Sequence, residues 1–217
     1  MHAEELSGWG PVVIAADHTG TTHGRGRHQS CRESIVAGLS GLPALVPAGI
    51  LEDEPLADAV RDLVSVEEML SYRGSGVLLH NDLKPAHLFG VSDGRRRHLS
   101  SIIDWGDVSV GDMAAELARL SMSGPTVTAA FLEGYGVQTD TDLFERLARY
   151  RLLSNIGALN YEYRAGGDWY DAYRDRIRED ATQLSKCVQI HAAVIGRSPQ
   201  ESSSGMRRLA ISRRLWA

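Results

Sequence analysis

Two short apolar segments that each lead to an aspartate constrain the fold of this chain more than any other feature. Residues 77–79 are Val-Leu-Leu and precede Asp82, and residues 99–103 precede Asp104. A second apolar run at residues 88–91 lies between them, followed by a Ser-Asp-Gly sequence typical of a tight turn. We therefore expect a strand, a loop that carries Asp82, and a two-stranded hairpin that ends at Asp104.

Helical periodicity dominates the sequence on either side of this region. Apolar residues recur at helical spacing from residue 54 onward, and pairs of glycines or a Gly-Ser-Gly sequence end several of the periodic runs. The predicted fold class is α+β, mainly α, with helices over 54–72, 112–120, 126–135, 142–164 and 168 to about 187.

The two ends of the chain show no such periodicity. Residues 1–40 are rich in Gly, His, Thr and Arg, so we predict loop there, apart from a strand at residues 12–15. Residues 186–217 contain six basic residues and one acidic residue, a net charge of +5, and are predicted to form a flexible basic tail. The predicted domains are 1–40, 41–185 and 186–217.

Composition excludes several classes of protein. The formal charge of −5 on 217 residues leaves about −10 on the body once the basic tail is set aside, which disfavours nucleic acid and suits a cationic ligand. Cys31 and Cys187 have no metal-binding spacing, which favours a reducing cytoplasm over a disulfide framework. The short apolar run at residues 11–16 and the acidic residues before it predict neither a signal peptide nor a membrane span there.

The residues around the two aspartates suggest phosphoryl transfer. That reaction needs an acceptor for a hydroxyl proton and hard oxygen ligands for a magnesium ion that bridges nucleotide phosphates. Asp82 lies two residues after a histidine that ends a strand, and Asp104 begins Asp-Trp-Gly at the end of the next hydrophobic segment. The alternative is that both aspartates cap loops. For His80 we predict a structural role, as a hydrogen-bonded core histidine that supports the loop, and participation in the reaction is the alternative.

Three ordered motifs carry a resemblance to a known family. They are His80-Asn81-Asp82-Leu83, Ile103-Asp104-Trp105 and the block Gly-Asp-Met-Ala-Ala-Glu-Leu-Ala at residues 111–118. Residues 55–185 resemble the C-terminal lobe of the aminoglycoside phosphotransferase and choline kinase family, which is protein-kinase-like. The motifs are most similar to those of aminoglycoside 2''-phosphotransferases and, less closely, of macrolide phosphotransferases.

The resemblance implies a role for each matching residue. Asp82 corresponds to the base that accepts the hydroxyl proton, and Asp104 to a magnesium ligand. His87 stands where most members have a second metal-binding Asn, although a plain loop residue is the alternative there. Lys84 is placed to neutralise the transferred phosphoryl group, and ATP or GTP is the implied co-substrate.

A cationic substrate would need acidic residues near the site. Residues 131–180 contain ten acidic side chains and seven arginines. Glu162 and Asp168 are the candidates for contacts with a small hydroxylated, cationic molecule, while a solvated helical face is the alternative for each.

The segment before the motifs limits the activity that can be expected. The 79 residues before His80 contain no lysine, and the Gly-rich run at 20–26 lacks the context of a phosphate loop. The nucleotide-binding lobe implied by the family is therefore expected to be missing or degenerate. Two hypotheses stay open: a phosphotransferase, or a non-catalytic C-terminal lobe that serves as a binding module.

Overall fold

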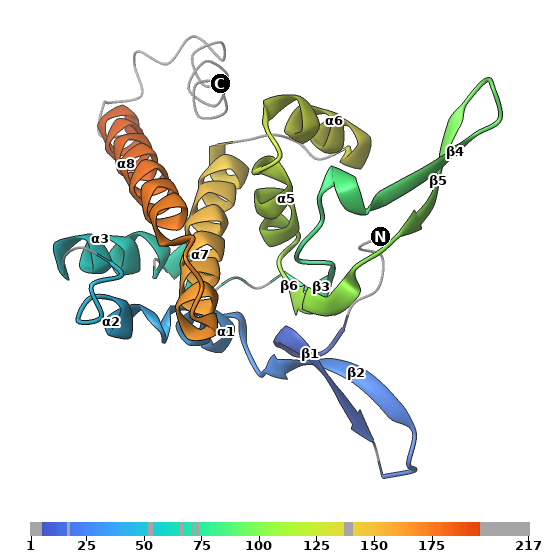
Figure 1. The fold of residues 1–217 in the computed structure, drawn as a ribbon, viewed down its shortest axis with the longest axis horizontal. Coiled ribbons are helices and arrows are strands. Elements are labelled where there is room, and N and C mark those ends of the chain that lie inside the picture. Colours follow the sequence, from blue (N-terminus) through green and yellow to red (C-terminus); the bar gives the residue numbers. More distant parts are fainter. Residues whose placement is uncertain are drawn as a thin grey trace. The chain divides into compact units, whose positions relative to one another are not determined.

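The computed structural model describes residues 6–16, 18–51, 54–65, 67–70, 72, 74–136 and 141–195. The chain divides into two compact units, which we call the sheet unit (Met1–Ser34 and Arg73–Tyr135) and the helical unit (Ile35–Tyr72 and Gly136–Ala217). Figure 1 shows the strands and helices of each. The fold class is α+β and mainly helical, as the sequence predicts.

The sheet unit is built on a four-stranded antiparallel sheet in the order β2-β1-β6-β3. Its central strand β6 pairs with β3 through Val110 and Leu78, and with β1 through Val110 and Gly10. Pairing with β6 fixes β3, the strand that leads into the loop carrying Asp82. The strands span Trp9–Ala16 (β1), Thr22–His28 (β2), Val77–Leu79 (β3) and Ser109–Gly111 (β6).

The prediction of loop over most of residues 1–40 is wrong for the described part of that segment. Strands β1 and β2 form a hairpin, and helix α1 (Cys31–Leu39) follows it. The glycines were interpreted as loop signals, but a Cβ on Gly26 would lie 2.1 Å from the Trp9 backbone nitrogen. Glycine therefore permits the close strand approach beside an irregularity in the β1–β2 register.

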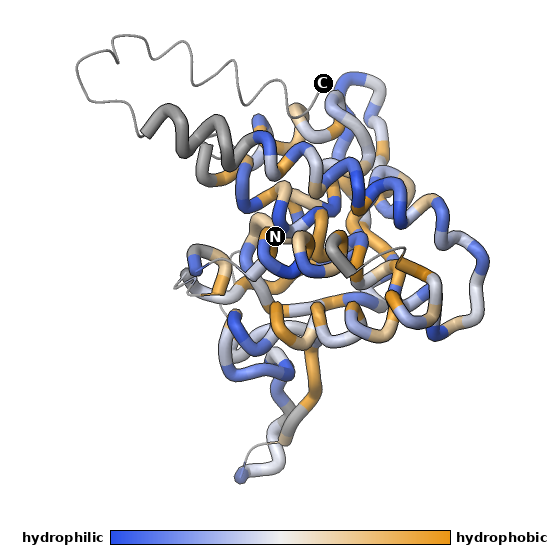
Figure 2. Tube along the Cα trace, turned by 90° about the vertical axis from the view of Figure 1, so that its left-hand side faces the viewer, coloured by the Kyte–Doolittle hydropathy of each residue, from blue (hydrophilic) through white to orange (hydrophobic). Residues whose placement is uncertain are grey.

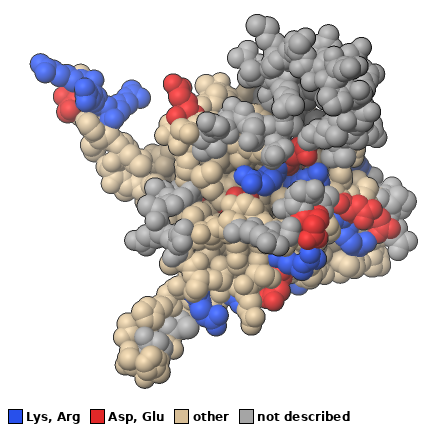
Figure 3. Space-filling model, turned by 180° about the vertical axis from the view of Figure 1, so that it is seen from behind, with Lys and Arg blue, Asp and Glu red and all other residues tan. Residues whose placement is uncertain are grey.

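A second, two-stranded sheet forms the predicted hairpin between the two motifs. Strands β4 (Leu88–Ser92) and β5 (Arg97–Ile102) pair antiparallel, and Gly94 adopts a positive φ of 83° in the turn. The Asp93 carboxylate stabilises the turn by accepting hydrogen bonds from the backbone N–H groups of Arg95 and Arg96. Basic side chains gather at the free end of this hairpin, upper left in Figure 3.

Two 3-10 turns and two helices complete the sheet unit. The turns η1 (Pro85–His87) and η2 (Trp105–Asp107) follow the two motif aspartates. Asp112 caps helix α5 (Met113–Ser121) by accepting the backbone N–H of Ala114 at 2.9 Å. Helix α6 (Pro125–Tyr135) packs against α5, and both helices agree with the predicted ranges within a residue or two.

The helical unit is organised around two long helices, α7 (Thr141–Ala165) and α8 (Tyr170–Ile195), which pack against each other. Hydrophobic residues, orange in Figure 2, alternate with hydrophilic ones along the chain, as expected for helices with one buried face. Shorter helices contact this pair: α3 (Glu54–Val64) contacts both helices and α2 (Leu42–Leu45) contacts α7, while α4 is Glu67–Leu70. The buried residues of the long pair include Leu143, Leu147, Leu152, Ile156, Leu159, Ile177 and Leu184.

Helix α8 extends beyond the predicted tail boundary at residue 185 and continues to Ile195. The rest of the predicted basic tail, residues 196–217, lies outside the described residues. Of the helices in the described part of the chain, none combines the length and the apolar character needed to cross a membrane.

Candidate functional site

The loop at residues 80–87 is anchored by a buried histidine. His80 is fully buried, and its Nε2 lies 2.8 Å from the carbonyl oxygen of Ile103, just before Asp104. Because a carbonyl can only accept, Nε2 must carry the proton, and Nδ1 then accepts the backbone N–H of Asp82. His80 therefore links the two aspartate-bearing segments, which confirms the prediction of a hydrogen-bonded core histidine.

Both motif segments contain a backbone conformation that is rare for residues other than glycine. Asn81 has φ of 66° and Asp104 has φ of 65°, and they are the two non-glycine residues with positive φ in the described chain. Asn and Asp tolerate the left-handed region better than other side chains do. Such strain is found where the surrounding structure holds a functional group in place.

Glu116 on helix α5 holds the start of the 80–87 loop. Its Oε2 accepts the backbone N–H of His80 at 2.6 Å and that of Asn81 at 3.1 Å. Burial raises the pKa of Glu116 by more than these hydrogen bonds lower it. Burial of Tyr135 and the nearby charge of Glu116 raise the pKa of Tyr135 to about 12. The loop is thus positioned by a carboxyl group that the solvent does not reach.

Asp82 lies between two cations. Its Oδ2 accepts a hydrogen bond from Lys84 Nζ at 2.9 Å, and its Oδ1 accepts one from Arg119 Nη2 at 3.0 Å. Burial by itself would raise the pKa of Asp82, but the hydrogen bonds and charges of Lys84 and Arg119 outweigh it, and the net pKa is lowered. Asp82 is therefore ionised at neutral pH and able to accept a proton or bind a cation.

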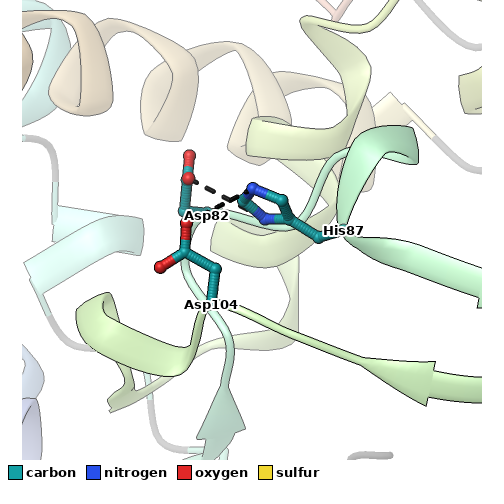
Figure 4. A group of neighbouring side chains, drawn as sticks. All are labelled: Asp82, His87 and Asp104. Carbon is teal, nitrogen blue, oxygen red and sulfur yellow. Dashed lines mark ion pairs between the residues drawn. The ribbon is translucent and has the colours of Figure 1, made fainter.

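His87 and Asp104 complete a three-residue cluster with Asp82, drawn in Figure 4. One ligand atom from each lies within 4.8 Å of the others. His87 Nε2 is 3.4 Å from Asp104 Oδ2, and His87 Nδ1 is 3.9 Å from Asp82 Oδ2. The Asp104 side chain is 61% exposed, whereas that of Asp82 is only 16% exposed.

This donor set fits a divalent cation. Two carboxylates supply the hard oxygen ligands that magnesium prefers, and the buried Nδ1 of His87 has no hydrogen-bond partner among the described residues. An imidazole is a softer ligand, so its contribution to magnesium binding is weaker than that of an amide oxygen. Asp104 is the most accessible of the three ligands.

The structure brings together four of the residues singled out by sequence, namely Asp82, Lys84, His87 and Asp104. The two proposed substrate contacts belong to the helical unit. There, Glu162 Oε1 accepts the backbone N–H groups of Asp168 and Trp169 at 3.0 and 3.1 Å, and thereby satisfies the turn before α8. The Asp168 side chain is exposed.

Sequence reasoning missed Arg119. A signal was available, because Arg119 follows Glu116 by three residues on a predicted helix, and residues at that spacing share a face. Because Glu116 holds the start of the Asp82 loop, the shared helix face places Arg119 near that loop as well.

Comparison with known proteins gives one family match. A sequence profile of the phosphotransferase enzyme family, APH, matches residues 38–153. No protein with a curated description matches the chain.

Solved structures share the fold at low sequence identity. The crystal structure of aminoglycoside phosphotransferase APH(4)-Ia superimposes with a TM-score of 0.53 at 18% identity, covering 86% of this chain and 58% of that one. A thermostable mutant of the same protein, in ternary complex with ADP and hygromycin B, gives a TM-score of 0.53 at 16% identity, covering 85% of this chain and 58% of that one. The chain thus spans less than two thirds of the length of these proteins.

Proposed function

Because this chain belongs to the phosphotransferase enzyme family, we propose that it transfers the γ-phosphate of ATP or GTP to a hydroxyl group of an aminoglycoside-like or other small molecule. The observation that carries the proposal is the convergence of Asp82, His87 and Asp104 from two separate segments within 4.8 Å. Solved proteins of similar fold bind ADP, AMP-PNP and hygromycin B, which supports a nucleotide and an aminoglycoside as ligands.

In this proposal Asp82 orients the acceptor hydroxyl and receives its proton. The hydroxyl oxygen forms the new bond to the γ-phosphorus as the bond from that phosphorus to the nucleoside diphosphate oxygen breaks. Lys84 Nζ lies 2.9 Å from Asp82, so it would be close to the transferred group and would balance its negative charge. Asp104 and His87 would hold a magnesium ion, which when bound neutralises charge on the nucleotide phosphates.

The proposal includes a weak nucleotide site. The described residues before β3 contribute the β1–β2 hairpin and helices, and residues 1–79 contain no lysine to pair with phosphates. We accordingly propose that the N-terminal lobe is degenerate and that the residues from 80 to 107 provide most of the phosphate contacts. Millimolar nucleotide affinity is then expected.

A second candidate function is a non-catalytic binding module. One observation favours it: each oxygen of Asp82 already accepts a hydrogen bond, one from Lys84 and one from Arg119, so an acceptor hydroxyl has to share or displace one of these donors. Glu162 and Asp168 would then serve a cationic ligand without chemistry.

Calorimetry and a transfer assay separate the two functions. The full chain with magnesium should bind ATP or GTP at millimolar concentration and should release ADP or GDP faster when an aminoglycoside is added. Asp82→Asn should bind nucleotide and release none. Absence of binding heat with both nucleotides would contradict the enzyme, whereas ligand binding without nucleotide turnover would identify the binding module.

A further inference from the structure

Arg119 contacts the proposed base from a different element than the rest of the site. It lies in the last turn of α5, and its Nη2 donates to Asp82 Oδ1 at 3.0 Å. Its side chain is 30% exposed, and its guanidinium is held by the Asp82 carboxylate. The placement differs from that of a surface cation at a helix C-terminus, because the head group points at the 80–87 loop.

The guanidinium has hydrogen-bonding capacity that the protein does not use well. Arginine carries five N–H donors in a planar fork, and a fork of this kind matches two oxygens of a phosphate. The other recorded partner is the Sδ atom of Met122, 3.9 Å from Nη1. A thioether is a weak acceptor, so a phosphate oxygen would be a better partner for the same nitrogen.

Two cations flank Asp82. Lys84 and Arg119 contribute two positive charges to one carboxylate, and Lys84 is 47% exposed. Lys84 donates to one oxygen of Asp82 and Arg119 donates to the other, so the carboxylate lies between the two cations. An anion that draws one cation away would free an oxygen of Asp82 at the moment when the base is needed.

We propose that Arg119 binds the transferred phosphoryl group and, by leaving Asp82 Oδ1 for the phosphate, exposes that oxygen to the acceptor hydroxyl. The identity of the anion as a phosphoryl group rests on the proposed function. The proposed contact of the anion with Arg119 and Lys84 is the same in either case. Asp82 and the anion compete for the same guanidinium, and this competition makes the assignment testable by binding alone.

The test measures binding of inorganic tripolyphosphate to the full chain by calorimetry, without acceptor. Arg119→Met, which keeps an unbranched apolar stem and removes the charge and the donors, should weaken binding about tenfold or more. Arg119→Lys, which keeps the charge but not the fork, should give a smaller loss. Arg96→Met, an exposed arginine at the turn of the β4–β5 hairpin in the same unit, should change binding less than twofold.

A second variant moves affinity in the opposite direction. Asp82→Asn removes the competing carboxylate and should tighten tripolyphosphate binding several-fold, and the double variant with Arg119→Met should lose most of that gain. Circular dichroism checks that each variant is folded. If Arg119→Met does not fold, Arg119→Lys and Asp82→Asn decide the question.

Two results would overturn the assignment: native affinity in Arg119→Met, or no measurable tripolyphosphate binding by the native chain at millimolar concentration. Failure of the proposed function is distinguishable. Binding that depends on Arg119 in a chain that transfers no phosphate would reject the transferase and keep the anion site. Phosphate transfer at the native rate in Arg119→Met would reject the anion site and keep the transferase.

Discussion

Asp82 of the sheet unit and Asp180 of the helical unit are both aspartates held by two side-chain donors. Asp82 accepts from Lys84 and Arg119, and Asp180 accepts from Arg151 and Asn155, each bond 2.8 to 3.0 Å long. Their pKa values nevertheless shift in opposite directions. Burial raises the pKa of Asp180, and the Arg151 charge and the Asn155 hydrogen bond offset this only in part.

The difference comes from exposure and from the number of cations. Asp180 is 6% exposed and has one cationic partner, so loss of water decides its pKa. Asp82 is 16% exposed and has two, so attraction decides. The first arrangement is suited to joining α7 to α8, and the second leaves an ionised carboxylate next to accessible donors. A hydrogen-bond count alone would not have distinguished a structural aspartate from a functional one.

The largest expected effect is on transfer activity and should be confined to one of these two aspartates. Asp82→Asn removes the proton acceptor and should lower the transfer rate by about 10²- to 10⁴-fold, a typical contribution of a general base. Asp180→Asn is the matched control and should keep the rate within a few-fold. Measurement of nucleoside diphosphate release checks both. Equal losses of transfer rate in the two variants would contradict the assignment of Asp82 as functional and Asp180 as structural.

For stability we expect the opposite: substitution of Asp180 should have a larger effect than substitution of Asp82. Asp180→Ala leaves the Arg151 guanidinium and the buried Asn155 amide without their shared acceptor, and we expect a loss of about 2–4 kcal/mol in the free energy of unfolding. Asp82→Ala removes the acceptor of two cations that water can reach, so it should lower the free energy of unfolding by under about 1 kcal/mol. Urea unfolding followed by circular dichroism measures both. A larger loss for Asp82 would show that it is the structural member of the pair.

Glu116→Gln asks whether a buried carboxyl of the sheet unit behaves like Asp180. The amide oxygen can still accept from the loop, but the NH2 group would replace the buried Oε1, which has no hydrogen-bond partner among the described residues, so we expect a loss of about 1–2 kcal/mol in stability. Because Glu116 holds the His80 and Asn81 backbone, the transfer rate should also fall. Glu133→Gln, an exposed change on α6, is the control. A rate loss without any loss of stability would mean that Glu116 acts in chemistry and not in support of the loop.

The smallest expected effect is a pH dependence. The pKa of Asp180 is raised above its ordinary value of 3.8, so the folded chain holds that proton more tightly than the unfolded chain does. Its contribution to stability is therefore complete below pH 3.8 and is lost as pH rises through the folded pKa. Native protein should lose more stability than Asp180→Asn over that interval. An equal change of stability with pH in the native protein and in Asp180→Asn would contradict the raised pKa of Asp180.

Much of the sheet unit was predictable because its signals are local. The apolar runs before and after Asp82, the turn at Gly94 and the helices α5 and α6 depend on neighbouring residues, and the structure has them where the sequence indicates. The β1–β2 hairpin was not predicted because the need for glycine at position 26 comes from the close backbone of Trp9, seventeen residues earlier in the chain. No local sequence pattern indicates such a close approach.

The sequence by itself determined which residue types stand in the motif, their order along the chain and the family to which they belong. Tertiary structure alone decided what surrounds each of them. Asp82 and Arg119 lie 37 positions apart and meet because β3 and α5 pack together, and that contact sets the direction of the Asp82 pKa. Electrostatic shifts depend on distance and burial in space, so a motif can name the carboxylate but cannot give its charge partners.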